Sequence, residues 1–63
     1  MDGEIVEVRV TCSYAVRNVV AENIQKGLSN MGFLPVTFPR YYRSARNDSN
    51  TLIYQSYIAK QLD

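Results

Sequence analysis

Apolar and polar side chains alternate from Glu4 to Cys12, near the beginning of the chain. One set of alternate positions is mostly apolar and holds Val6, Val8, Val10 and Cys12. The positions between them carry charged or polar side chains, apart from Ile5. Because successive side chains of a strand point to opposite faces, this pattern predicts a half-buried β-strand whose valines face a core.

The period changes after Ser13. Apolar side chains then recur every four residues, with two more beside them: Val16, Val20, Ile24, Leu28, Val19 and Met31. This stripe predicts an amphipathic α-helix with one face on the core. Ser13 is the candidate N-cap, and Gly32 provides the stop because glycine adopts the left-handed conformation easily. Gly27 costs the predicted helix about 1 kcal/mol relative to alanine, and we interpret it as allowing a close approach of the helix to the sheet.

Two further strands are predicted in the second half of the chain. In Phe33–Phe38, Leu34, Val36 and Phe38 share one parity. Pro35 and Pro39 occupy the other parity and place this strand at a sheet edge, because proline cannot donate a ladder hydrogen bond. The segment Thr51–Leu62 is ambiguous. Its β-branched and aromatic residues favour a strand that closes a hairpin onto Phe33–Tyr42, and a helix capped by Ser49 or Asn50 is the alternative.

The predicted fold is α+β with the order β-α-β-β, a three-stranded sheet with one helix packed on one face. A right-handed crossover would make the second strand parallel to the first. The alternative is β-α-β-α with a C-terminal helix. The second sheet face would mix charged, aromatic and aliphatic side chains: Glu7, Arg9, Thr11, Thr37, Tyr57, Ile5 and Phe33. Such a face is usually covered by a second layer, and a symmetry mate is the commonest cover.

Length and composition support self-association. The 63 residues make a single domain, 1–63, and a chain this short buries only about 60% of its unfolded surface. One cysteine allows no internal disulfide, and the absence of histidine argues against a structural zinc site. With those sources of stability missing, we expect a homodimer or a larger homo-oligomer.

Charge and hydropathy exclude several classes of partner. The net charge of +1 gives no general case for binding membranes or nucleic acid. No apolar run approaches the roughly 20 residues that span a bilayer. The acidic start of the chain does not resemble a signal peptide, and one unpaired cysteine fits the reducing cytosol. We therefore expect a cytoplasmic protein without metal or cofactor.

Two groups of residues are candidate binding sites. The first is a run of interleaved arginine and tyrosine: Arg40, Tyr41, Tyr42, Arg43 and Arg46. These residue types are enriched in protein–protein hot spots, and they can also stack on a base and bind phosphates. The second group surrounds the start of the predicted helix: Ser13, Tyr14 and Arg17. Amides and an arginine at a helix N-terminus can bind an anion.

Cys12 lies between the first strand and the helix. This layout resembles the phosphocysteine loop of the IIB domains of sugar phosphotransferases and the loop of low-molecular-weight tyrosine phosphatases. The resemblance covers about Val6 to Gly32 and implies a reactive thiol. Four residues separate Cys12 from Arg17 where the phosphatase loop has five, and the intervening segment has no glycine. Because Cys12 shares the parity of the three valines, a small buried hydrophobic side chain is the favoured interpretation.

The sequence does not indicate catalysis, since it lacks histidine and its six acidic residues form no obvious pair. We expect a non-enzymatic regulatory or inhibitor-type protein that contacts or sequesters a partner through its Tyr/Arg-rich segment. Many chains of this size act so, including proteins of phages and mobile elements. The alternative is an oligomeric binder of a nucleotide-like phosphate at the strand–helix turn, and a phosphocysteine-type domain comes third.

Overall fold

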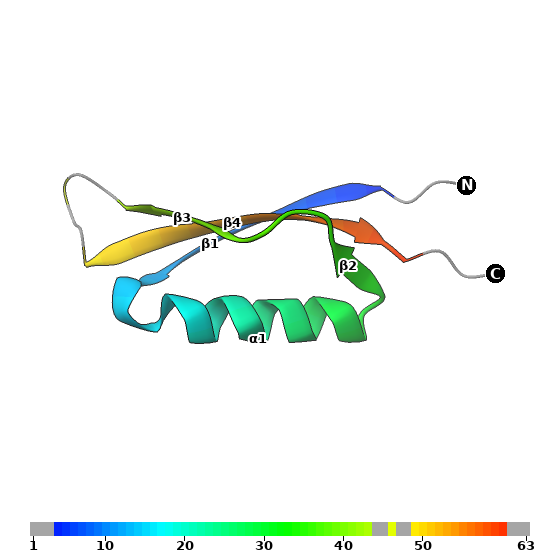
Figure 1. Cartoon of the computed structure of the whole chain (residues 1–63), viewed down its shortest axis with the longest axis horizontal. Coiled ribbons are helices and arrows are strands. Elements are labelled where there is room, and N and C mark those ends of the chain that lie inside the picture. Colours follow the sequence, from blue (N-terminus) through cyan, green and yellow to red (C-terminus); the bar gives the residue numbers. More distant parts are fainter. Residues whose placement is uncertain (1–3, 44–45, 47–48, 61–63) are drawn as a thin grey trace.

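A four-stranded sheet lies over a single helix in the computed structural model, which describes residues 4–43, 46 and 49–60 (Figure 1). The elements follow in the order β1 (Ile5–Ser13), a short 3-10 turn (Tyr14–Val16), α1 (Arg17–Asn30), β2 (Phe33–Pro35), β3 (Arg40–Arg43) and β4 (Asn50–Ala59). The fold is α+β, as predicted, but the order is β-α-β-β-β with four strands, so the predicted three-stranded β-α-β-β sheet is wrong.

β4 is the central strand, and all of its pairings are antiparallel. β1 pairs with it on one side, from Ile5 opposite Ile58 to Ser13 opposite Asn50. β2 and β3 pair with it one after the other on the opposite side. β1 and β2 are therefore parallel to each other, as predicted, with β4 between them. The strand prediction for Thr51–Leu62 is confirmed through Ala59, and the C-terminal helix is wrong for this described part.

The predicted strand Phe33–Phe38 is interrupted after Pro35. From Pro35, opposite Tyr57, to Arg40, opposite Tyr54, the chain advances five residues against three on β4. The edge strand therefore has two more residues than β4 over this stretch. Because two is an even number, odd-numbered residues lie on the helix side of the sheet in both β2 and β3.

Hydrogen bonds replace the ladder across this interruption. The Ser56 N–H donates to Thr37 Oγ1 at 3.1 Å, and Gln55 Nε2 donates to the Thr37 carbonyl at 2.8 Å. Pro35 and Pro39 lie on either side of this interruption, and the Val36 N–H between them donates to the Ser56 carbonyl at 3.0 Å.

The core lies between β4 and α1. Alternate residues of β4 are buried: Thr51, Ile53, Gln55 and Tyr57. They pair with Cys12, Val10, Val8 and Val6 of β1, so the valines face the helix as predicted. Tyr57 is completely buried and Phe33 is half-buried, on the helix side of the sheet. Their predicted position on the second face is therefore wrong.

Phe33 and Leu34 exchange the positions that the sequence predicted for them. Because β2 presents Phe33 and Pro35 to the helix, Leu34 is exposed on the opposite face. Val36 and Phe38, which share its parity, are exposed as well, and the Phe38 side chain is 89% exposed.

The helix buries less of its surface than its pattern predicts. Its inward side consists of Val20, Ala21, Ile24 and Leu28, and Ala21 alone is fully buried. Val16 belongs to the 3-10 turn, and Val19 lies about 100° around the helix from Val20. Both are exposed, as is Met31.

The two ends of the helix differ from each other in how well they were predicted. Gly32 has φ +93°, which confirms it as the left-handed stop. Ser13 makes no side-chain cap, and α1 begins only at Arg17. A Cβ added to Gly27 would meet nothing within 4 Å, so the predicted close approach at this glycine is wrong.

Candidate functional site

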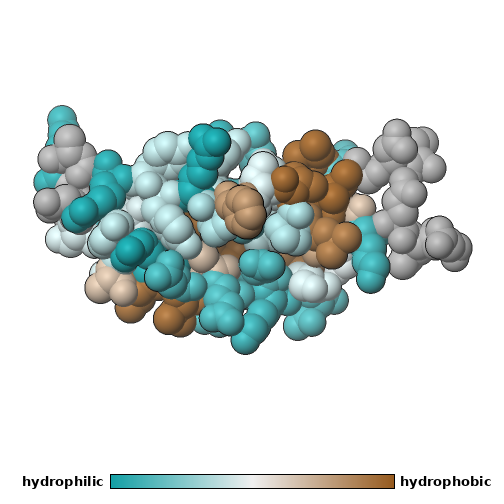
Figure 2. Space-filling view, viewed as in Figure 1, coloured by the Kyte–Doolittle hydropathy of each residue, from teal (hydrophilic) through white to brown (hydrophobic). Residues whose placement is uncertain are grey.

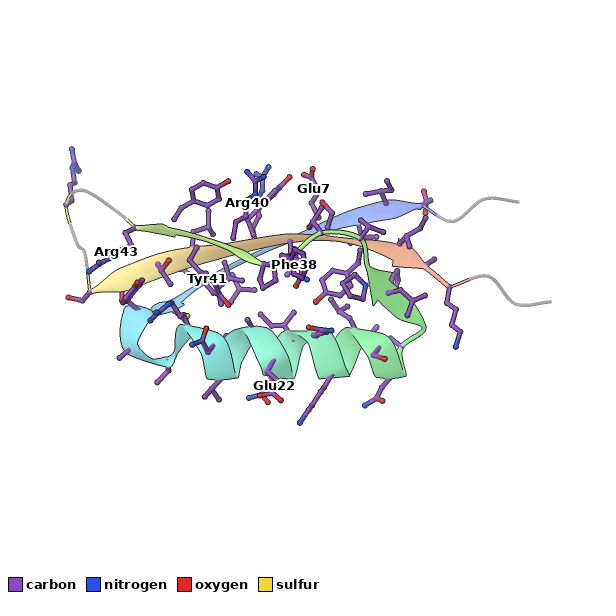
Figure 3. The ribbon with its side chains drawn as sticks, in the orientation of Figure 1. Glu7, Glu22, Phe38, Arg40, Tyr41 and Arg43 are labelled. Carbon is purple, nitrogen blue, oxygen red and sulfur yellow. The ribbon has the colours of Figure 1, made fainter. Side chains whose placement is uncertain are left out.

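β3 divides the predicted Arg/Tyr segment between the two faces of the sheet. Arg40 lies opposite Tyr54, whereas Tyr41 lies opposite the buried Ile53. Figure 3 shows Arg40 on the side of the sheet away from the helix and Tyr41 on the helix side. Arg46 is exposed in the connection that follows β3. The segment is therefore not one surface but contributes to two clusters.

The first cluster occupies the sheet face opposite α1, which we call the open face. Its members are Arg9, Arg40, Tyr42 and Tyr54, from three strands, and Glu7 lies beside them. The Arg9 guanidinium carbon lies 5.4 Å from the centre of the Tyr54 ring. The Tyr42 and Tyr54 rings meet edge to face at 6.5 Å. Cation–π and aromatic contacts therefore connect the side chains of the open-face cluster to one another.

Glu7 is engaged within this face. Its Oε2 accepts a hydrogen bond from the Tyr54 hydroxyl at 2.6 Å, and its Oε1 lies 3.5 Å from Arg9. The hydrogen bond to Glu7 raises the pKa of Tyr54 above its ordinary value. A hydrogen bond with Tyr42 likewise raises the pKa of Arg40. Because Glu7 neutralises Arg9, Arg40 leaves a net positive charge on the open face.

An apolar area adjoins the open-face cluster. Ile5, Ile58 and Leu34 lie side by side on three strands, and the Ile5 side chain is 64% exposed. Figure 2 shows hydrophobic side chains gathered at this end of the molecule, where β1 begins. β4, with ten residues, is about 34 Å long, and α1, with 14, is about 21 Å long. The helix is therefore too short to cover the whole of the sheet face on which it packs.

The second cluster surrounds Tyr14 at the other end of the sheet. The guanidinium carbon of Arg17 lies 3.8 Å from the Tyr14 ring centre, and that of Arg43 lies 4.1 Å from it. Arg17 also lies 5.8 Å from the Tyr41 ring and donates to the Tyr14 carbonyl at 2.9 Å. The Tyr14 N–H donates to the Ser49 carbonyl at 2.7 Å, which ties the turn to the start of β4. Residues of both predicted binding groups, from the strand–helix turn and from the Arg/Tyr segment, therefore lie together within one chain.

Ser13 and Cys12 do not join this cluster as functional groups. Ser13 ends β1 with an exposed side chain. Cys12 is half-buried on the helix side of the sheet, opposite Thr51. Among the described residues, no three side chains of the metal-binding types gather, and no helix is long and apolar enough to cross a membrane.

Sequence reasoning missed several residues of these surfaces. Glu7, Arg9 and Tyr54 lie on the open face, and although Glu7 and Arg9 were expected on this face, none of the three was predicted as a binding residue. Phe38 was expected within a strand and instead projects from its interruption, beside a hollow of about 310 Å³ that Gln25 and Gln55 help to line. The prolines on either side of Phe38 are the sequence signal for this exposure.

Comparisons with protein-family models, curated proteins and solved structures found no match to this chain. The fold and its surfaces define a small α+β protein with one sheet face that no described element covers.

Proposed function

We propose that the protein is a small non-enzymatic binding protein that contacts a partner protein through its open face. The observation that carries this proposal is the composition of the uncovered face, where Tyr42, Tyr54, Arg9 and Arg40 lie beside an exposed aliphatic area. Tyrosine and arginine are enriched in the centres of protein interfaces, because each combines a large contact area with directional hydrogen bonds.

The chemistry of the face indicates its partner. Arg9 is neutralised by Glu7, so Arg40 supplies the positive charge that a partner would meet. The neighbouring Ile5 and Leu34 are exposed and apolar. A complementary surface therefore presents a carboxylate next to aliphatic or aromatic side chains.

Successive side chains of β3 lie on opposite faces of the sheet, and this provides matched variants for a test. Arg40→Ala and Arg43→Ala each remove one arginine from the same strand, on opposite faces. We would immobilise the wild-type chain and both variants, and compare the proteins that each retains from the natural host. Tyr42→Ala and Glu22→Ala, the latter on the outer side of α1, complete the set.

A partner of the open face would bind Arg40→Ala and Tyr42→Ala at least about tenfold more weakly, as for hot-spot residues. The same partner would bind Arg43→Ala and Glu22→Ala as well as it binds the wild-type chain. A partner that Arg40→Ala and Tyr42→Ala retain but Arg43→Ala loses would contradict this proposal.

A second candidate function is the binding of a nucleotide-like anion at the Tyr14 cluster. The observation that favours it is the convergence of two guanidinium groups, from α1 and β3, on one aromatic ring. Arginine forms bidentate hydrogen bonds with phosphate and stacks on planar rings.

Calorimetric titration with inorganic phosphate and with ADP tests this second function. Binding should be lost in both Arg17→Ala and Arg43→Ala, should weaken as salt rises, and should persist in Arg40→Ala. Equal loss in all three variants would indicate a nonspecific charge effect and would exclude the site.

A further inference from the structure

We propose that a second copy of this chain pairs with the outer edge of β1, in an antiparallel register that sets Glu7 opposite the second copy's Arg9. This interface is formed by the backbone edge of β1, and it shares the side chains of Glu7 and Arg9 with the open face.

The outer edge of β1 is regular and unpaired within the described chain. β1 pairs with β4 alone among the described residues. The Ala59 N–H donates to the Glu4 carbonyl and the Tyr14 N–H to the Ser49 carbonyl, so even-numbered residues turn their backbone groups toward β4. Hydrogen-bonding pairs alternate along an antiparallel ladder, so the odd-numbered residues from Ile5 to Ser13 turn theirs outward. The edge has no proline or bulge, which makes it a ready template for another strand.

Symmetry limits the possible registers. Two identical chains that pair antiparallel along one edge are related by a two-fold axis perpendicular to the sheet. Since the odd-numbered residues of both copies turn their backbone groups outward, odd-numbered residues lie opposite odd-numbered ones, and even-numbered opposite even-numbered. Three registers place the two-fold axis near the middle of β1. In these registers Glu7 lies opposite the second copy's Glu7, Glu7 lies opposite its Arg9, or Arg9 lies opposite its Arg9.

Charge selects one of these three registers. Like charges directly opposite each other destabilise a sheet, and opposite charges stabilise it. The middle register forms two Glu7–Arg9 pairs across the interface, whereas each neighbouring register forms a like-charge pair. Since these residues also lie 3.5 Å apart within one chain, the four side chains would form one alternating network.

The helix side of β1 supports the same register. There Val8 would meet the second copy's Val8, and Val6 would meet Val10. None of these valines is buried in the single chain, and Val6 is 36% exposed, although all three face the helix layer. The two-fold axis places both helices on the same side of the extended sheet, so the paired valines would lie between them. Cross-strand pairs of β-branched residues stabilise a sheet.

Exchange of the two charges tests the interface and its register together. In sedimentation equilibrium, the wild-type chain should have twice its mass of 7.2 kDa. Glu7→Arg and Arg9→Glu should each be monomeric, because each creates like-charge pairs. An equimolar mixture of the two variants, and the double variant, should both regain the dimer. A monomeric wild-type chain, or single variants that still dimerise, would overturn the proposal.

A disulfide at the two-fold axis tests the register even if the charge variants fold poorly. Position 8 forms a non-hydrogen-bonded pair with itself, with Cα atoms about 4.5 Å apart, within the range of a disulfide. In a Cys12→Ser background, Val8→Cys should form a covalent dimer on mild oxidation. Val10→Cys alone should form none, and it should crosslink when mixed with Val6→Cys. Crosslinking of Val10→Cys to itself, with none at position 8, would contradict the register.

Discussion

At the scale of single residues, two linked hydrogen bonds connect the core to the interrupted edge. The Tyr57 hydroxyl donates to Gln55 Oε1 at 2.7 Å, and Gln55 Nε2 donates to the Thr37 carbonyl. Gln55 and Tyr57 are both buried. Among the described residues, no buried side-chain nitrogen or oxygen lacks a hydrogen-bond partner, which is what allows a glutamine to occupy the centre of so small a core.

Removing Gln55, which takes part in both of these hydrogen bonds, should cost more than removing the Tyr57 hydroxyl at one end. Gln55→Leu leaves the Tyr57 hydroxyl and the Thr37 carbonyl without partners, and we expect a loss of about 2 kcal/mol or more in the free energy of unfolding. Tyr57→Phe leaves only one acceptor unpaired and should cost about 1 kcal/mol. Urea denaturation of the variants measures both losses. A smaller loss for Gln55→Leu than for Tyr57→Phe would show that the network does not stabilise the core.

Burial of Tyr57 predicts a loss of stability in alkali. Burial raises the pKa of Tyr57 above the ordinary value of about 10. The unfolded chain therefore releases the phenolic proton at a lower pH than the folded chain does. This contribution to the free energy of unfolding is intact below about pH 10 and is lost as the pH rises through the folded pKa.

The matched variant is Tyr57→Phe, which cannot ionise at this position. Thermal unfolding followed by circular dichroism, at neutral pH and above about pH 10, should show a smaller alkaline decrease in the variant than in the wild-type chain. Equal decreases would mean that other groups account for the alkaline effect.

At the scale of elements, the two glycines around the end of α1 should respond in opposite ways to alanine. Gly27 is exposed inside the helix with free space around a Cβ, so Gly27→Ala should stabilise by about 1 kcal/mol. Gly32 has φ +93°, where a Cβ is strained, so Gly32→Ala should destabilise by about 1 kcal/mol. Urea midpoints of the two variants should therefore shift in opposite directions. A destabilising Gly27→Ala would show that the space beside the helix is occupied in solution.

Alternation in the sequence predicts β1 and its valine face correctly, but not the orientation of β4. The buried face of β4 carries the polar Thr51 and Gln55, while its open face carries Leu52 and Tyr54. Hydropathy therefore does not separate the two faces. Thr51 Oγ1 donates to the Tyr42 carbonyl at 2.9 Å, and Gln55 Nε2 donates to the Thr37 carbonyl of the edge strand's interruption. The hydrogen bonds that allow these residues to be buried are not visible in the local sequence.

The candidate site was predicted by residue type and not by geometry. Alternation could have shown that Arg40 and Arg43 lie on opposite faces once β3 was recognised as a strand. Which of them approaches Tyr14 depends on the register of β3 against β4, and that register follows from the two extra residues between Pro35 and Arg40. An insertion held by the side chain of Thr37 leaves no periodic signal.

At the scale of the whole molecule, pairing through β1 predicts a thermal unfolding midpoint that depends on protein concentration. A ligand that binds only the folded state stabilises it by mass action, and a second copy acts as such a ligand. The midpoint of the wild-type chain should rise with concentration in differential scanning calorimetry. The midpoint of Glu7→Arg should stay constant, since its β1 edges repel each other. Parallel behaviour of the two proteins would place self-association elsewhere on the molecule.

The two edges of the sheet also differ in what they allow beyond a dimer. β2 has only three residues and β3 four, and Pro35 and Pro39 flank the break between them. Such an edge offers few consecutive donors and acceptors to an incoming strand. A fibre grows only when each added subunit exposes a fresh edge like the one just used. Two copies joined through β1 would turn the broken edge outward at both ends, so assembly would terminate at two subunits and the protein would resist amyloid-like growth even when concentrated.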